Sequence, residues 1–471
     1  MMDDNESGIS RRQALVGGAG LAAASACLPA AAAKASEHAS ASADALSVSP
    51  PDLDFLRTDA LMDADRLRFL MREAGLDALI VTQPANVFYL TNHWPQLDRM
   101  GFDGSGIAIL CADPARPLTV VMHAFLYYYT HTPESEFSDR EIFTYTNPIG
   151  APEVEGEEPP SAEARVMEVA DGGTLTSLDR HRLLMFGRTQ PPSADATWAM
   201  RKALHSLGVW QGRVGIDHLG LEAGLRARGF EGDITSQGQD IVRTARLTKS
   251  PTEIRMMRLA SERNVAAAIT AARSARELGS ARALRSAFFG EAGRRGNAGV
   301  FMVIAGTSTE ALDREFTDGM SVSIDCVSTC RFYHGDFGRT IFIGEPPRTV
   351  QRAASAVSTA WSEIREQLRP GMRFSEIPRI GRATLDRLGV DLNVSFRPHS
   401  VGLFHTDQPA TSLLTPAAPP DLVLQENMTL SVDCPVFLAG LGGTIHLEDL
   451  MLIRDGRAEA IHDVPPPVIT V

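Results

Sequence analysis

Residues 321–344 read SVSIDCVSTCRFYHGDFGRTIFIG and predict two apolar strands joined by a tight connection. Asp325 and Asp336 lie eleven positions apart, each in or beside one of the expected strands. Because paired strands return side by side with alternating side chains, this spacing can bring both carboxylates to one face of a hairpin. A buried carboxylate is costly unless it is paired, hydrogen-bonded or bound to a metal. Aspartate is also common at ordinary β-turns, so the hairpin alone leaves turn chemistry and a functional site as alternatives.

Three further polar side chains stand out downstream of this hairpin. His399 lies in the run RPHSVGLFHTD, and His405 follows six residues later. Asp433 stands in the middle of the expected strand LSVDCP, and Glu448 interrupts the apolar run TIHLEDLM. Taken singly, they have ordinary explanations: a hydrogen-bonded core histidine, a strand-end cap and a surface residue on an edge strand. Only their combination with the aspartate pair points to a site.

Residues 1–35 have the pattern of a twin-arginine signal peptide. The motif Ser10-Arg11-Arg12-Gln13-Ala14-Leu15 precedes an uncharged run rich in Ala and Gly, and Ala31-Ala32-Ala33 is a candidate cleavage site. The run is broken by Pro29 and is weakly apolar, which favours removal over a membrane anchor. The pattern predicts a periplasmic protein that is exported folded, which suits a chain that acquires a metal in the cytoplasm. Residues 36–54, rich in Ala, Ser and Pro, predict a mobile leader.

Charge and cysteine content limit the classes of partner. The 471-residue chain has a formal net charge of −13, which disfavours nucleic acid because phosphate binding needs a basic surface. No segment beyond the signal reaches membrane-spanning length, so we expect no membrane partner after signal removal. Cys326 and Cys330 lack a second close pair in zinc-site spacing, and most of the cysteines that remain after loss of Cys27 are expected to be small buried hydrophobes.

The apolar pattern predicts an α/β chain with two domains. A boundary falls within residues 241–254, where Ser250 with Pro251 and Glu253 has the pattern of a helix start closed by a capping box. Before this boundary the sequence predicts strands over residues 76–82, 87–91, 107–111, 118–122 and 214–216, and helices over residues 194–209 and 219–229. After it, the sequence predicts helices over residues 250–278, 281–294, 349–368 and 374–388, and strands over residues 300–305, 429–437 and 443–453.

The order Asp, Asp, His, acid, Glu on strands of one domain resembles the pita-bread metallopeptidase family, which includes Xaa-Pro aminopeptidase, prolidase, methionine aminopeptidase and the metal-free creatinase. Asp336-Phe337-Gly338-Arg339-Thr340 fits the D-x-x-R-T motif of that family. Residues 76–91 are similar to a strand-turn-strand of the creatinase/prolidase N-terminal domain. The resemblance implies an α/β (α+β) chain, with such a domain at 55–245 and a pita-bread catalytic domain at 246–471.

The resemblance also implies a role for each of the polar positions. Asp325 and Asp336 would be the chelating and the bridging carboxylate of a site for one or two divalent ions. His399, Asp433 and Glu448 would complete this site, whose hard carboxylates and imidazole suit Mn, Co, Fe or Zn. His405 and Asp433 would be the catalytic side chains, His405 by orienting the substrate and Asp433 as a carboxylate beside the metal-activated water.

The implied activity is that of an exported metal-dependent hydrolase resembling Xaa-Pro aminopeptidase or prolidase, which cleaves a small peptide or amide. Three positions depart from the family pattern. Peptidases usually have a His where Asp313 or Arg314 stands here, Asp433 replaces a Glu, and the run that ends near His405 is one residue tighter. These departures leave open an alternative on the same scaffold, which ranks second: a lyase or C–N hydrolase of a small zwitterion such as dimethylsulfoniopropionate or a creatine-like compound.

The sequence also supports expectations about a binding-protein alternative and about the oligomeric state. A binding protein with a degenerate site is disfavoured, because all five metal positions remain acidic or His. The resemblance also implies a homodimer, in which Asn92-His93-Trp94-Pro95 is a candidate for a loop that closes the partner's site. A plain surface turn after a strand is the alternative for these four residues.

Overall fold

The computed structural model describes most of the chain from Leu53 onward, namely residues 53–95, 100–101, 106–130, 140–150, 156–161, 168–189, 191–309, 311, 313–410 and 420–471. The expected signal peptide and the leader up to residue 52 therefore lie outside the described residues. The leader was expected to reach residue 54, but Asp54 already begins the short helix η1 (Asp54–Arg57). None of the described helices combines the length and the apolar character that a membrane span needs.

The N-terminal region is built on a six-stranded sheet with strand order β4-β3-β2-β1-β5-β6. Alternate residues of the central strand enter two different cores, Ala78 and Ile80 on one face and Leu79 and Val81 on the other. Both faces are thus covered, which explains why β1 is apolar throughout. The strands are β1 (Ala78–Val81), β2 (Gly106–Cys111), β3 (Leu118–His123), β4 (Arg140–Tyr145), β5 (Val214–Ile216) and β6 (Ile234–Thr235).

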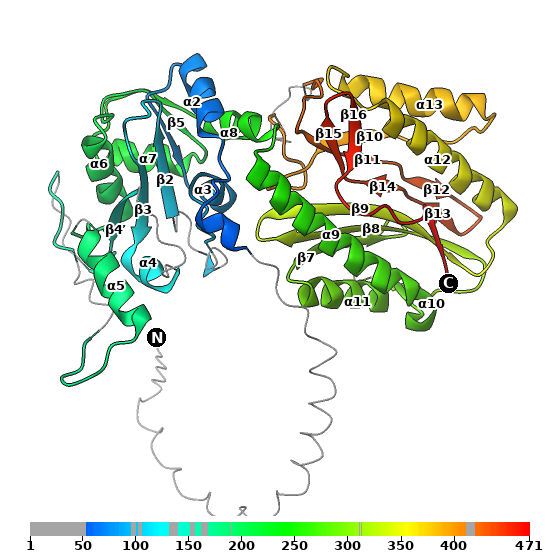
Figure 1. Ribbon diagram of the computed structural model, residues 1–471, viewed down its shortest axis with the longest axis horizontal. Coiled ribbons are helices and arrows are strands. Elements are labelled where there is room, and N and C mark those ends of the chain that lie inside the picture. Colours follow the sequence, from blue (N-terminus) through cyan, green and yellow to red (C-terminus); the bar gives the residue numbers. More distant parts are fainter. Residues whose placement is uncertain are drawn as a thin grey trace, which may run out of the picture. The chain divides into compact units, whose positions relative to one another are not determined.

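Helices cover both faces of this sheet (Figure 1). The core on one face includes residues of α6 and α7, and the core on the other face includes residues of α2, α3 and α8. The helices of this region are α2 (Ala64–Glu73), α3 (Pro84–Thr91), α4 (Ala124–Thr130), α5 (Ser177–Arg188), α6 (Ala196–Ser206), α7 (Gly220–Ala227) and α8 (Gly238–Arg246).

The prediction of a strand over residues 87–91 is wrong, because these residues belong to helix α3. Pro84 occupies the first turn of this helix, where its missing N–H costs no hydrogen bond. Every residue from Ala85 to Thr91 is buried, so the segment lacks the polar stripe that marks a surface helix. Its uninterrupted apolar run therefore resembled a buried strand.

The C-terminal region contains a seven-stranded sheet, ordered β12-β13-β8-β9-β14 with β7 on β8 and β17 on β9, and a four-stranded sheet ordered β10-β11-β15-β16. The strands of the larger sheet are β7 (Ala298–Ile304), β8 (Met320–Cys330), β9 (Tyr333–Ile343), β12 (Val436–Leu438), β13 (Gly443–Ile445), β14 (Glu448–Asp449) and β17 (Val468–Thr470). The strands of the smaller sheet are β10 (Arg397–Ser400), β11 (Thr429–Asp433), β15 (Met451–Arg454) and β16 (Arg457–Ala460).

Two groups of helices enclose these strands, α9 to α11 on one side and α12 with α13 on the other (Figure 1). Together with the two sheets they form the expected pita-bread arrangement. The helices are α9 (Pro251–Arg273), α10 (Ala275–Leu278), α11 (Ala281–Arg294), α12 (Arg348–Gln367), η4 (Phe374–Glu376) and α13 (Ile377–Arg387).

The predicted start of α9 is confirmed at the level of individual hydrogen bonds. The Ser250 hydroxyl accepts from the Glu253 backbone N–H at 3.1 Å, and the Glu253 carboxylate accepts from the Ser250 backbone N–H at 3.0 Å. Such a box satisfies two backbone donors that the first helical turn leaves open.

The prediction that the cysteines are small buried hydrophobes is confirmed for the four in the described residues. Cys111, Cys326, Cys330 and Cys434 are buried free thiols.

Candidate metal centre

The hairpin of β8 and β9 brings Asp325 and Asp336 to the same face of the sheet. In its antiparallel register Asp336 pairs with Val327, and Asp325 pairs with Gly338. The two aspartates are therefore offset by two residues along neighbouring strands, and side chains two apart share a face. Cys326 points the other way into a core, as the alternation requires.

Three other strands, β10, β11 and β14, carry His399, Asp433 and Glu448. On β14, Glu448 pairs with Gly338, so this glycine lies between Glu448 and Asp325. On β10, His399 pairs with Ser431 of β11, and the Ser431 hydroxyl donates to Glu448 Oε1 at 2.5 Å.

The predictions of single strands over residues 429–437 and 443–453 are wrong in extent. The first segment is divided into β11 and β12, and the second into β13, β14 and β15.

His399 lies at the centre of the site. Its Nε2 atom is 3.5 Å from Asp336 Oδ2, 3.6 Å from Asp433 Oδ2 and 3.5 Å from Glu448 Oε1. His405 Nε2 lies 3.4 Å from the same Asp336 oxygen. Asp336, His399 and His405 thus form one group that can hold a cation.

A second group consists of Asp325, Asp433, Glu448 and His446, whose ligand atoms all lie within 4.8 Å of one another. His446 was missed by the sequence analysis, although a signal existed. It precedes Glu448 by two residues in an extended run, and this spacing places both side chains on one face. In the structure His446 Nε2 lies 3.1 Å from Glu448 Oε2.

Gly338 makes room for His446 inside the D-x-x-R-T motif. A Cβ atom at this position would lie 2.2 Å from His446 Cδ2 and 3.0 Å from Glu448 Cβ. No side chain of ordinary size fits there without moving the imidazole. A glycine at position 338 is therefore needed for the His446 imidazole to lie in the site.

The other motif residues hold β14 in place. Arg339 is fully buried and donates to the Glu448 carbonyl at 2.8 Å and to Asp449 Oδ1 at 2.5 Å. The Thr340 hydroxyl donates to the His446 carbonyl and accepts from the His446 N–H, each at 3.0 Å. These hydrogen bonds to the backbone of His446 and Glu448 therefore fix the positions of both residues.

The burial of this cluster fits a bound cation. Both carboxylate oxygens of Asp336, one of Asp325 and both ring nitrogens of His399 are buried without a hydrogen bond. A buried charge without compensation is strongly unfavourable. A donor set of carboxylates and imidazoles is the kind that binds divalent transition ions. The residues present therefore fit one or two divalent ions held between Asp325, Asp336, His399, Asp433 and Glu448, with His405 and His446 adjacent.

Crowding of like charges shifts the pKa values in the cluster. Burial, followed by the negative charge of Glu448, raises the pKa of Asp325 to about 8 and that of Asp433 to about 6. Burial alone would lower the pKa of His399, but the surrounding carboxylates raise it to about 10. The protein thus gathers more negative charge than the site can hold unless cations or protons neutralise it.

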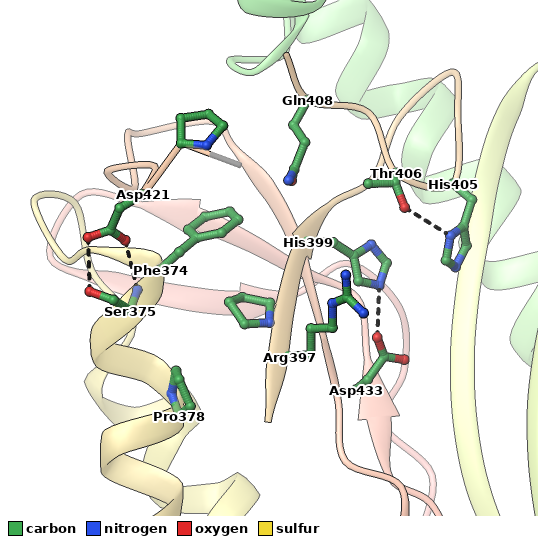
Figure 2. A pocket seen from close by; sticks show the side chains of 12 residues that line it. Phe374, Ser375, Pro378, Arg397, His399, His405, Thr406, Gln408, Asp421 and Asp433 are labelled. Atoms are coloured by element: carbon green, nitrogen blue, oxygen red, sulfur yellow. Dashed lines mark hydrogen bonds and ion pairs between the residues drawn. The ribbon is translucent and has the colours of Figure 1, made fainter. Parts of the chain in front are cut away.

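A cavity of about 620 Å³ opens onto one side of this cluster. Figure 2 shows His399, His405 and Asp433 at its inner wall. The ring of His405 lies 4.7 Å from that of His399 between centroids. His405 was predicted to orient the substrate, and its ring both approaches Asp336 and lines the cavity.

Two other sequence predictions can be located in the structure. Asp313, which with Arg314 was expected to stand at the His position of peptidases, is exposed and accepts from the Arg282 backbone N–H at the start of α11 at 2.9 Å. Asn92 and Pro95 of the candidate closing loop are buried, and the Asn92 side chain bonds to the backbone of Leu61 and Leu56. The closing role of this loop stays a prediction.

Comparison with known families supports this geometry. A family model described as metallopeptidase family M24 matches residues 239–455, which include every acidic and histidine residue of the cluster. The chain carries an M24 metallopeptidase domain. A second family model, the creatinase/prolidase N-terminal domain, matches residues 64–161. The description of family M24 as metallopeptidases agrees with the donor set of the cluster.

Individual relatives resemble the chain at low identity. A prolidase from Pyrococcus horikoshii OT3 superimposes with a TM-score of 0.60 at 18% identity, covering 86% of this chain and 99% of that structure. The "Probable dipeptidase PepE" of Mycobacterium bovis is 29% identical over 161 residues, 34% of this chain. An ectoine hydrolase of Halomonas elongata is 22% identical over 153 residues, 32% of this chain. The matches span only 41% and 38% of these two curated relatives.

Proposed function

We propose that the protein is a metal-dependent hydrolase that cleaves a small peptide or amide, as its similarity to prolidases and dipeptidases suggests. The observation that carries this proposal is the buried Asp336 carboxylate, which has no hydrogen bond of its own and faces His399 and His405 beside a cavity. The Asp336 carboxylate would bind a cation, and substrate in the cavity would reach that cation past His399 and His405.

In this proposal Asp325, Asp336, His399, Asp433 and Glu448 hold one or two divalent ions. Bound ions of this kind supply a water of near-neutral pKa and polarise the substrate carbonyl. Asp433 is part of the cluster and also lines the cavity, so its carboxylate is placed to accept a proton from the attacking water. His405 lies at the same wall and would orient the substrate carbonyl or its leaving group.

A metal and substrate screen tests the proposal. The purified protein, loaded separately with Mn, Co, Fe and Zn, should retain at least one ion per chain after gel filtration and should hydrolyse Xaa-Pro dipeptides. Elemental analysis and amine release measure the two results. A protein that retains no ion after loading would contradict the assignment of the cluster, whatever its activity.

A second candidate function has a specific observation in its favour. Peptidases usually have an imidazole where Asp313 or Arg314 stands here, and Asp313 is instead hydrogen-bonded to the start of α11. The partial similarity to an ectoine hydrolase points the same way. The same screen should therefore include ectoine, creatine and dimethylsulfoniopropionate. Turnover of one of these with no dipeptide hydrolysis would favour a C–N hydrolase or lyase of a small zwitterion.

We further propose that residues 1–35 direct export to the periplasm by the twin-arginine route. Changing Arg11-Arg12 to Lys-Lys should retain the full-length protein in the cytoplasm, as measured by cell fractionation and immunoblotting. A control change of Arg57 to Lys, outside the signal, should leave export unchanged. Export of the Lys-Lys variant at the normal level would refute the proposal.

The assembly is proposed to be a homodimer, in line with the resemblance from which that expectation came. Analytical ultracentrifugation at micromolar concentration would measure the mass in solution. A single species at the monomer mass would refute this proposal without bearing on the metal centre.

A further inference from the structure

We infer that a second cavity of the C-terminal region, of about 410 Å³, is a binding site for a small organic acid with an apolar body. Arg365 of α12 binds the acid group in this assignment. The cavity has no lining residue in common with the cavity beside the metal cluster. The inference therefore stands apart from the proposed hydrolase activity and goes beyond it.

Strand β14 separates this second cavity from the metal cluster. The strand consists of Glu448 and Asp449, and neighbouring side chains of a strand point to opposite faces. Glu448 faces His446 of the cluster, at 3.1 Å between Oε2 and Nε2. Asp449 instead contacts Arg339 and Trp361, and all three line the second cavity. The second cavity thus lies behind the metal centre.

The negative charge of Asp449 is already compensated by the protein. Its Oδ1 accepts from Arg339 Nη2 at 2.5 Å, its Oδ2 accepts from Trp361 Nε1 at 3.0 Å, and the Arg339 and Asp449 side chains are buried. His462 adds no positive charge here, because its Nε2 accepts from the Leu450 N–H at 3.3 Å and is therefore unprotonated. One carboxylate and one guanidinium thus balance each other behind β14.

Arg365 supplies a second cation beside this balanced pair. Its Nη1 lies 3.8 Å from Asp449 Oδ2, which is longer than a hydrogen bond of about 3 Å, and its side chain is 36% exposed. Within the residues that the structure describes, the Arg365 guanidinium makes no hydrogen bond. An arginine stays charged at physiological pH, and its planar fork matches a carboxylate in a bidentate way. The cavity wall therefore presents an uncompensated cation to an acidic ligand.

Two hydroxyl groups of α12 line the same cavity as Arg365. Ser358 and Ser362 are spaced so that they share one face of the helix with Arg365. A helical hydroxyl often donates to the carbonyl four residues earlier, as Thr359 does to Ser355 at 3.0 Å. Neither Ser358 nor Ser362 makes such a bond in the described part of the chain. Their hydroxyls are placed to donate to the same acid group.

The rest of the cavity wall defines the body of the ligand. It is largely apolar, with Leu447, Val464 and the prolines at 465–467. Small-molecule sites typically have volumes of about 300–1,000 Å³ and combine apolar walls with a few polar anchors, as this cavity does. An inorganic anion would leave the apolar wall uncovered, and a neutral ligand would leave the Arg365 charge unpaired. A carboxylate attached to a compact ring satisfies both.

Photolabelling tests the inference, because it locates the bound acid and distinguishes this cavity from the metal centre. The probe is 4-azidobenzoate, irradiated with manganese-loaded protein and mapped by peptide mass spectrometry. We expect label within residues 358–365 or 464–467, displaced by benzoate but not by benzamide or inorganic phosphate. In Arg365→Gln this labelling should weaken roughly 10-fold, the effect of losing a charged hydrogen bond, and Arg365→Lys should restore part of it. Arg352→Gln, an exposed arginine of α12 outside the cavity lining, should label like the parent.

The possible results are distinct. Label found only on peptides that line the cavity beside the metal centre, or label at α12 that survives unchanged in Arg365→Gln, overturns the site. Displacement by benzamide or phosphate as effective as that by benzoate overturns the assignment to an organic acid. Loss of label in Arg365→Gln with an unchanged thermal midpoint and manganese content supports the inference. A failure to hydrolyse any peptide would refute the proposed function and leave these labelling results intact.

Discussion

Replacing Asp336 with Asn is expected to abolish stable metal binding and to lower kcat/KM by on the order of 10³-fold or more, because it removes a charged ligand on which the activated water depends. Asp336 has both oxygens buried without hydrogen bonds and lies within 3.5 Å of two imidazoles. The change keeps the size of the side chain, removes its negative charge and replaces one acceptor oxygen with an amide NH2 that cannot bind a metal ion. Elemental analysis after gel filtration and a peptide hydrolysis assay would measure the two effects.

The same substitution should leave the fold intact, which makes the result interpretable. The cluster carries an excess of negative charge, so loss of one carboxylate relieves repulsion in the metal-free protein. The thermal midpoint without added metal should therefore stay unchanged or rise, whereas the increase that metal produces in the parent should disappear. Asp386→Asn, on the exposed surface of α13, is the matched control. Normal metal content and turnover in Asp336→Asn would refute the assignment of the centre.

The sequence was sufficient to predict the hairpin and the strands that carry the residues of the candidate metal centre. Asp325, Asp336, His399, Asp433 and Glu448 converge because each lies on a strand whose alternation fixes the direction of its side chain. Local patterns also sufficed for α11, predicted over residues 281–294 and observed as Ala281–Arg294. Such features depend on short-range periodicity and capping, which a single sequence displays.

Features that depend on contacts between distant segments could not be predicted in this way. The absence of a side chain at Gly338 acquires its meaning only when His446, more than a hundred residues later, occupies the space. The helix α3 was misread because burial on every side removes the polar stripe by which a helix is recognised.

A second distant contact, between Arg246 and Asp407, underlies the other large expected effect. Both side chains are fully buried, and Arg246 Nη2 donates to Asp407 Oδ1 at 2.6 Å while its Nε donates to Oδ2 at 3.1 Å. Asp407 Oδ2 also accepts from the Leu403 N–H at 3.0 Å, and the Asp407 N–H donates to the Ser400 carbonyl at 2.8 Å. The pair therefore anchors the loop that carries His405.

Replacing Arg246 with Met should lower the free energy of unfolding by about 3–5 kcal/mol, because it leaves a buried carboxylate without its main partner. Urea unfolding monitored by circular dichroism would measure this loss. Activity should fall as well, since His405 would lose its fixed position. The double variant Arg246→Met with Asp407→Leu should recover much of the stability, because two apolar side chains can replace a buried ion pair at little cost. A double variant less stable than either single one would contradict this account of the pair.

The pH dependence of the Arg246→Met effect separates lost charge pairing from lost packing. Burial alone would raise the pKa of Asp407, but the Arg246 guanidinium and the Lys249 ammonium hold that pKa below its usual value. In the parent the pair thus contributes stability above the unfolded pKa of about 4, and this contribution is lost as the pH falls through the lower folded pKa. In Arg246→Met, Lys249 and Arg243 remain near Asp407, but burial should raise its pKa. The stability deficit should therefore be largest near neutral pH and shrink on acidification, whereas a pure packing defect would be independent of pH.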